Sequence, residues 1–307
     1  MPSRGLTGEH TRSAARGRSA AAAAALVACA GVLLAAAPAA LAGSNGHTCG
    51  VKLDGKARCW GFDGNGQSSP PGGKFDSLSA GGTHTCGVRP NGKARCWGFD
   101  GGGQASPPGG KFDSLSAGLG HSCGVRPNPN GKARCWGSDD FGQASPPGGK
   151  FGAVSAGAGY TCGVRPNGKA RCWGFNGSGE ASPPGGRFGA VSAAGTHTCG
   201  VRPNGKARCW GFDDDGQASP PGGKFDSLSA GSSHTCGVRP NGNARCWGAD
   251  SSGQASPPGG TFDSLSAGGD HSCGVRPNGK ARCWGNDATG QASPPGGRFR
   301  SVSAGDT

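Results

Sequence analysis

One stretch of sequence recurs seven times and leaves little freedom in what this chain can fold into. The copy that starts at Phe75 reads FDSLSAGGTHTCGVRPNGKARCWGFDGGGQASPPGGK. All seven tryptophans take the same place in their copies and follow one another at 37 residues, with a single interval of 39: Trp60, Trp97, Trp136, Trp173, Trp210, Trp247 and Trp284. A period of this length, rich in turn residues, is typical of propellers and solenoids.

Each copy is predicted to form one propeller blade. In the second copy, short half-apolar stretches alternate with Gly-Gly-Thr, Pro-Asn-Gly and Pro-Pro-Gly-Gly, which predicts strands at residues 75–80, 84–89, 93–97 and 104–106. Four short antiparallel strands in a meander make a blade, and prolines are tolerated beside an outermost strand. The sequence therefore predicts an all-β, seven-bladed β-propeller over residues 43–307, built from repeats of 37–39 residues.

The cysteines are expected to stabilise a chain that has little apolar material. Only 33% of the residues are hydrophobic, and 65 of the 307 are glycine. In the second copy, a Pro-Asn-Gly turn pairs Arg89 with Lys93 and so places Cys86 opposite Cys96. At a non-hydrogen-bonded position the two Cα atoms approach to about 4.5 Å, which a disulfide can bridge.

Fourteen of the 15 cysteines fall into such pairs, and the third pair has two extra residues that lie in its turn and spare the register. The predicted disulfides join Cys49 to Cys59, Cys86 to Cys96, Cys123 to Cys135, Cys162 to Cys172, Cys199 to Cys209, Cys236 to Cys246, and Cys273 to Cys283. Zinc ligation and a Cys–His nucleophile are the alternatives. They are disfavoured because close Cys-x2-Cys spacing and a recurring third catalytic group are both missing from the sequence.

Residues 1–42 are predicted to be a secretion signal. Arginines precede an Ala/Leu/Val-rich run, and Ala40-Leu41-Ala42 has the small-x-small form of a cleavage site, so the mature chain is expected to begin near Gly43. A lipoprotein anchored through Cys29 is the alternative, but the residues that follow Cys29 stay apolar. The protein is therefore expected outside the cell or associated with the cell wall, where disulfides form.

The two ends of the repeat region are expected to share one blade. The first copy enters directly at His47-Thr48-Cys49 and lacks a preceding Phe-x-x-Leu-Ser-Ala strand, whereas residues 299–304 supply such a strand after the last copy. If the last strand completes the first blade, the ring closes without an open sheet edge.

The repeat resembles that of the regulator of chromosome condensation family. The shared pattern is Phe-x-x-(Leu/Val)-Ser-Ala-Gly-x-x-His-(Thr/Ser)-Cys-Gly-Val, then Cys-Trp-Gly-x-Asp-x-x-Gly-Gln and Pro, and it covers residues 43–307. The resemblance implies a seven-bladed propeller of the secreted bacterial type, distantly similar to the type II β-lactamase inhibitor protein. It also implies structural roles for the recurring His47, His84, His121, His197, His234 and His271, whose place in the fourth copy is taken by Tyr160.

Comparison of the copies predicts one variable face. The loop after Trp-Gly differs most between copies, and a meander puts it on the same side as the first turn of each blade. We call this side the top face. Its candidate protein-binding residues are Phe62, Asp63, Phe99, Asp100, Asp139, Asp140, Phe141, Phe175, Asn176, Phe212, Asp213 and Asp214. Aromatic side chains at such a rim are typical anchors of protein interfaces.

The opposite side, which we call the bottom face, carries the Pro-Asn-Gly turns and the Pro-Pro-Gly-Gly linkers. Most Lys and Arg residues of the repeats flank these turns and linkers, and a basic face can attract a polyanion. The candidate residues for that alternative are Arg89, Lys93, Arg95, Lys132, Lys169, Lys206 and Lys280. A solvated surface multiplied by duplication is the other interpretation.

No catalytic set, metal motif or phosphate loop stands out from the repeats, so we expect a binding protein without a cofactor rather than an enzyme. The leading hypothesis is a monomeric scaffold that binds another extracellular protein through the top face. Inhibition of a secreted β-lactamase-like enzyme would be a special case of it. Binding of an anionic cell-wall polymer through the bottom face is the alternative, and a hydrolase site in the central channel is a weaker third hypothesis.

Overall fold

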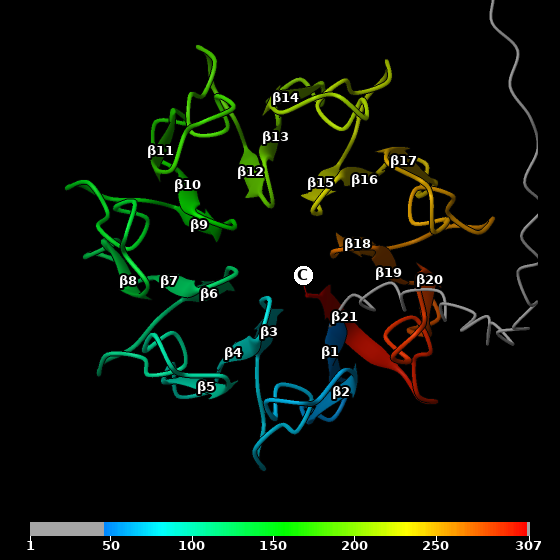
Figure 1. Ribbon diagram of the computed structural model, residues 1–307, viewed down its shortest axis with the longest axis horizontal. Coiled ribbons are helices and arrows are strands. Elements are labelled where there is room, and N and C mark those ends of the chain that lie inside the picture. Colours follow the sequence, from blue (N-terminus) through cyan, green and yellow to red (C-terminus); the bar gives the residue numbers. More distant parts are fainter. Residues whose placement is uncertain (1–45, 306–307) are drawn as a thin grey trace, which may run out of the picture. The chain divides into compact units, whose positions relative to one another are not determined.

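The computed structural model describes residues 46–305, and the predicted signal therefore lies outside the described residues. In this part the chain forms 21 strands in seven antiparallel sheets of three strands each. The sheets are arranged as blades around a central axis (Figure 1). The predicted seven-bladed β-propeller is confirmed, and within residues 46–305 there is no helix of the length and apolarity that a membrane crossing requires.

We number the blades in chain order from the first hairpin. The inner strands are β21 (Phe299–Ala304), β3 (Ser77–Ala80), β6 (Ser114–Ala117), β9 (Ala153–Ala156), β12 (Ala190–Ala193), β15 (Ser227–Ala230) and β18 (Ser264–Ala267). The middle strands are β1 (His47–Lys52), β4 (His84–Val88), β7 (His121–Val125), β10 (Tyr160–Val164), β13 (His197–Val201), β16 (His234–Val238) and β19 (His271–Val275). The outer strands are β2 (Ala57–Gly61), β5 (Ala94–Gly98), β8 (Ala133–Gly137), β11 (Ala170–Gly174), β14 (Ala207–Gly211), β17 (Ala244–Gly248) and β20 (Ala281–Gly285).

The hairpin between the middle and outer strands has the predicted register. In blade 2 the Arg89 N–H donates to the Lys93 carbonyl at 3.0 Å, and Gly92 occupies the left-handed region with φ 80°. Only a residue without a Cβ adopts that angle without strain, which explains glycine at this corner. The Asn91 side chain accepts from the Lys93 N–H at 3.0 Å and fixes the turn further.

This register brings the two cysteines of every blade together. Cys86 pairs directly with Cys96 across the hairpin, and all seven bonds form with Cα atoms 4.0–4.1 Å apart. In blade 3 the bond spans 12 residues rather than 10, and the pairing is unchanged because the extra residues lie in the turn. Seven covalent links thus tie the middle strands to the outer strands.

The prediction of four strands per blade was wrong, because the stretch expected to form the outermost strand is a turn. In blade 2 this stretch, residues 104–106, is held by Asp100, which accepts from the Ala105 N–H at 2.7 Å and from the Ser106 hydroxyl at 2.5 Å. Pro107 and Pro108 follow and have no N–H to donate to a ladder. Only a single bridge between Lys93 and Lys111 remains of the expected pairing.

The ring closes as predicted. Strand β21 pairs antiparallel with β1, so the first blade is built from both ends of the repeat region, with Cys49 opposite Ser303. In Figure 1 the red β21 and the blue β1 lie side by side. Each of the seven blades described within residues 46–305 therefore has its inner strand.

The apolar core consists of small clusters between neighbouring blades rather than one continuous interior. The ring of Phe75 packs on that of Trp97 with centroids 5.5 Å apart, and both contact Cys49 and Val51 of the preceding blade. The same Phe–Trp contact recurs in all seven blades. Each blade is therefore stabilised chiefly by its two neighbours.

Candidate functional site

A ring of buried hydrogen bonds joins each blade to the next. His47 Nε2 lies 2.7 Å from the Thr85 hydroxyl of blade 2, and both side chains are fully buried. Equivalent bonds of 2.7–2.8 Å join His84 to Ser122, His121 to Thr161, His197 to Thr235, His234 to Ser272, and His271 to Thr48. The structural role that the family resemblance implies for these histidines agrees with this burial.

The tautomer of these histidines follows from the hydroxyl partner. The Thr85 hydroxyl donates its single proton to the Gln67 carbonyl at 3.1 Å, so it accepts from His47 and the proton of the ring is on Nε2. The other ring nitrogen, Nδ1, is buried without a hydrogen-bond partner in all six histidines. A second proton would therefore create an unpaired buried charge.

Burial holds these histidines neutral. It lowers the pKa of His47 and His234 to about 3 and the pKa of His84, His121, His197 and His271 to about 4. Neighbouring histidines lower the pKa of His47 and His234 further, whereas a carboxylate of the top face opposes the shift. Each of these neutral, buried histidines is thus engaged in a hydrogen bond between two blades.

Blade 4 makes the same joint with different chemistry. Tyr160 replaces histidine, and its hydroxyl donates to the His197 carbonyl at 2.6 Å and accepts from the Thr198 hydroxyl at 2.9 Å. It also accepts from the Ala194 N–H at 3.3 Å. The tyrosine thus reaches the next blade without a group that titrates near neutral pH.

Small residues line the central channel. The Ser79 hydroxyl accepts from the Ala117 N–H at 3.0 Å, and the same serine-to-backbone contact passes from blade to blade around the ring. The cavity there is about 120 Å³ and is lined by serine and alanine side chains, with no histidine or carboxylate among its lining residues within 46–305. The channel serines therefore serve in inter-blade bonds, and the geometry gives no support to a hydrolase site there.

The first acidic residue of each top-face loop shapes that loop. Both Asp63 carboxylate oxygens accept hydrogen bonds, at 2.7 Å from the Ser68 N–H and 2.6 Å from the Ser69 hydroxyl. Asp100, Asp139, Asp213, Asp250 and Asp287 do the same. In blade 4 the Asn176 side-chain oxygen accepts from the Ala181 N–H, and its amide nitrogen donates to the Ser182 hydroxyl. Asp140 accepts from the Ser138 hydroxyl, and Asp214 is exposed.

The sequence analysis missed the residue that connects these loops to the joints. Gln104 is buried, and its side-chain oxygen accepts from the Gly102 N–H at 2.9 Å, while its main-chain carbonyl accepts from the Trp136 indole at 2.9 Å. In every blade the tryptophan indole and a threonine or serine hydroxyl lie within hydrogen-bond distance of the main-chain carbonyl at this position. In blade 4 the position is taken by Glu180. Its constant place four residues after the loop Asp or Asn was the available signal.

Four of the five predicted top-face phenylalanines are exposed. Phe99, Phe141, Phe175 and Phe212 are 47%, 58%, 45% and 38% exposed, whereas Phe62 is half-buried over its own loop. The rings of Phe141 and Phe175 meet edge-on with centroids 5.1 Å apart, which joins blades 3 and 4. Leu119 of the first turn in blade 3 is 39% exposed. Directly after Trp-Gly, blades 3, 6 and 7 have Ser138, Ala249 and Asn286 where the others have phenylalanine, and the Phe141 of blade 3 lies three residues further on.

The basic residues of the bottom face divide into two groups. The Arg89 guanidinium stacks on the Phe75 ring at 4.7 Å and donates to the Gly72 carbonyl at 3.0 Å. The equivalent Arg of blades 3 to 7 does the same, so this position holds the linker in place. Lys93 and Arg95 are exposed. Within residues 46–305 no Lys or Arg side chain pairs with a carboxylate, and no group of His, Cys, Asp and Glu converges as a metal site.

Comparison with known families identifies the class. The family model described as Regulator of chromosome condensation (RCC1) repeat matches residues 75–104, 112–143, 153–180, 225–254 and 262–291. The chain belongs to this family of propeller proteins. A search of curated proteins found no match.

Three solved structures show the range of relatives. The ectodomain of the Physcomitrella patens receptor kinase CR4 is 30% identical, with a TM-score of 0.70 over 80% of this chain and 72% of that one. The CRINKLY WD40 ectodomain of the Arabidopsis thaliana receptor kinase ACR4 is 28% identical, with a TM-score of 0.67 over 79% of this chain and 94% of that one. Prp20p from Saccharomyces cerevisiae is 15% identical, with a TM-score of 0.67 over 86% of each chain, and shows the fold alone.

The seven disulfides and the two ectodomain relatives together indicate an extracellular protein. Disulfides persist only in oxidising compartments in most organisms. The family and the ectodomain relatives are also consistent with a protein-interaction scaffold.

Proposed function

We propose that this protein is a secreted, non-catalytic scaffold that binds another extracellular protein through its top face. The observation that carries the proposal is the row of exposed rings on an otherwise small and polar surface. Phe99, Phe141, Phe175 and Phe212 come from four consecutive blades, and each is more than a third exposed. Aromatic side chains placed in this way are the usual anchors of protein interfaces.

Hydrogen bonds within each blade hold the loop that presents the exposed ring. Phe99 follows Gly98, and the Phe99 N–H donates to the Thr83 carbonyl at 2.9 Å, so its loop is fixed to the first turn of the same blade. The loop is closed further by Asp100 and Gln104. Anchors presented by fixed loops lose little freedom on binding, which favours affinity.

Binding of an anionic cell-wall polymer through the bottom face is the second candidate. The observation that favours it is that Lys93, Arg95 and their repeats are exposed and have no carboxylate partner within residues 46–305. Because Arg89 and its repeats hold the linkers, this candidate now rests on the lysines and on the second arginine of each hairpin.

Two matched variants separate the candidates. The immobilised baits are the wild-type protein, the Phe99→Ala/Phe212→Ala variant and the Lys93→Glu/Lys206→Glu variant. Each bait is used to capture proteins from culture supernatant and polymers from washed cell walls. The first candidate predicts a captured protein that is lost only in the phenylalanine variant. The second predicts a captured polymer that is lost only in the charge variant and that dissociates as salt rises. A capture profile that neither variant changes would contradict both.

Inhibition of a secreted β-lactamase-like enzyme is the special case of the first candidate. It predicts slowed substrate hydrolysis in the presence of the wild-type protein and full hydrolysis with the Phe99→Ala/Phe212→Ala variant.

A further inference from the structure

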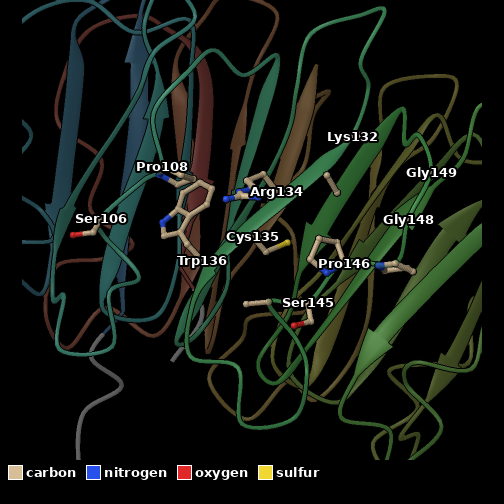
Figure 2. Close-up of a pocket in the computed structure, with 13 residues that line it drawn as sticks. Ser106, Pro108, Lys132, Arg134, Cys135, Trp136, Ser145, Pro146, Gly148 and Gly149 are labelled. Atoms are coloured by element: carbon tan, nitrogen blue, oxygen red, sulfur yellow. The ribbon is translucent and has the colours of Figure 1, made fainter.

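A basic groove runs along the outer edge of blade 3. A cavity of about 540 Å³ lies between strand β8 and the linker that follows it, and its lining includes Lys132, Arg134, Trp136, Pro146 and Gly148. Figure 2 shows these side chains around the opening, with the β8 residues at its centre and Pro146 and Gly148 to one side. The groove occupies the place where a fourth strand of the blade would lie.

The groove exposes a free sheet edge. Arg126 donates to the Lys132 carbonyl, so along β8 the hydrogen-bonded pairs with β7 fall at Lys132, Arg134 and Trp136. In an antiparallel ladder the intervening residues direct their N–H and C=O groups to the other side. Those residues are Ala133 and Cys135, which both line the cavity.

The linker of blade 3 does not satisfy this edge. A bridge between Lys132 and Lys150 covers only its lower end. Pro146 and Pro147 stand opposite the rest and have no N–H to donate. An unpaired edge of this kind is a template for a strand from another chain.

Two adjoining cavities with basic lining residues lie along this edge. A second cavity of about 170 Å³ shares Lys132, Ala133 and Arg134 with the first and adds Arg126 and Asn130. Asn130 lies in the hairpin that is two residues longer than those of the other blades. The two cavities therefore adjoin, and the exposed Lys132 and Arg134 stand where they meet.

We propose that this edge binds an extended acidic segment of a partner protein, which adds to β8 as the fourth strand of blade 3. Main-chain hydrogen bonds to the Ala133 carbonyl and to the N–H and carbonyl of Cys135 supply affinity, as in other cases of strand addition, because the bridge between Lys132 and Lys150 leaves these groups unpaired. Acidic side chains at every second position of the segment lie on the face of Lys132 and Arg134, and the small apolar side chains between them lie on the face of Ala133 and Cys135. This surface is separate from the top face and does not depend on the proposed function.

The first test uses a fluorescent peptide of about eight residues with alternating Glu and Val, long enough for one strand. Anisotropy titration with the wild-type protein should show saturable binding. Lys132→Glu/Arg134→Glu should weaken it by about tenfold or more, as expected when like charges face each other. The matched variant Lys169→Glu/Arg171→Glu changes the net charge equally in blade 4 and should bind as the wild type does. Equal weakening by both variants, or no binding to the wild type, would overturn the proposal.

The second test separates strand addition from simple attraction of anions. A Cβ on Gly148 or on Gly185 meets no atom within 4 Å, so both positions accept a larger residue. Gly148→Trp should obstruct the groove and abolish peptide binding, whereas Gly185→Trp in blade 4 should not. A peptide N-methylated at alternate residues keeps its charge but loses ladder donors, and it should bind at least about tenfold more weakly. If it binds as well as the parent peptide, or if the Gly148→Trp protein still binds the parent peptide, the site is only electrostatic and the proposal fails.

Discussion

The contacts between blades and the loops of the top face differ in how much the seven copies of the repeat vary. At the joints the chemistry hardly changes around the ring: histidine meets threonine or serine, with tyrosine once, and tryptophan always meets a main-chain carbonyl. In the loops the first carboxylate or amide is kept, but the residues beside it change from phenylalanine to alanine or asparagine. A joint must fit two blades at once, whereas a loop tip meets only solvent or a partner, so the copies can diverge there.

The largest expected effect concerns the covalent part of the blades. Each disulfide closes a short loop and contributes about 2–3 kcal/mol, so the loss of all seven removes roughly 15–20 kcal/mol, more than a typical domain has in total. Protein refolded with its cysteines reduced should therefore remain unfolded, with tryptophan fluorescence shifted to the red. A reduced protein with the denaturant midpoint of the oxidised one would contradict this account, and Cys86→Ala/Cys96→Ala is the single-bond control.

The next effect tests the joints through pH. The pKa values of the six histidines are lowered from 6.5 to about 3 or 4 in the folded state. At pH values between the folded and the unfolded pKa, the unfolded chain therefore binds more protons than the folded protein. The free energy of unfolding is at its full value above about pH 6.5 and decreases as the pH falls. Each histidine adds up to about 1.4 kcal/mol per pH unit to the slope. Urea midpoints measured from pH 7 to pH 4.5 should fall steeply.

A variant of blade 4 sharpens the same test. Tyr160→His places a seventh titrating group in the ring of joints, so the pH dependence of unfolding should become steeper by about one proton. Stability that does not change between pH 7 and pH 5, in either protein, would show that the histidines are not held neutral.

A pair of substitutions compares the two regions directly. His121→Ala removes a buried ring and its bond to Thr161, which should destabilise the fold by about 2–4 kcal/mol. Phe141→Ala removes a larger side chain that is 58% exposed and should change stability by no more than about 0.5 kcal/mol. Thermal unfolding measures both. A larger loss for Phe141→Ala would mean that the top-face rings are structural rather than available to a partner.

The smallest effect concerns the one carboxyl group among the buried amides. Glu180 is buried and accepts from the Ser178 N–H at 2.7 Å, where six blades have glutamine. Because a carboxylate costs more to bury than an amide, Glu180→Gln should stabilise the protein by about 1 kcal/mol. The reverse change in blade 3, Gln143→Glu, should destabilise it by a similar amount. Destabilisation by Glu180→Gln, or stabilisation by Gln143→Glu, in the denaturation curves would contradict the comparison.

The hairpins were the most predictable part of the molecule, and the linkers the least. The turn Pro-Asn-Gly fixes its own geometry, so the pairing of Cys86 with Cys96 followed from counting residues. The absence of a fourth strand did not follow, because it depends on Asp100 holding residues 104–106 in a turn. Similarly, Arg89 was predicted to face a polyanion, but in the fold its guanidinium stacks on Phe75. The exposed phenylalanines remain predictions as binding residues.

The repeat by itself determined the number of blades, the disulfide pairs and the closure of the ring, because period, turn residues and the displaced last strand are local properties that can be counted along the chain. Only the tertiary structure decided which polar groups meet across blades. His47 and Thr85 are 38 residues apart and touch only when two blades lie next to each other. The open edge of β8 likewise exists only because the chain beside it turns away, and no local pattern of residues contains that information.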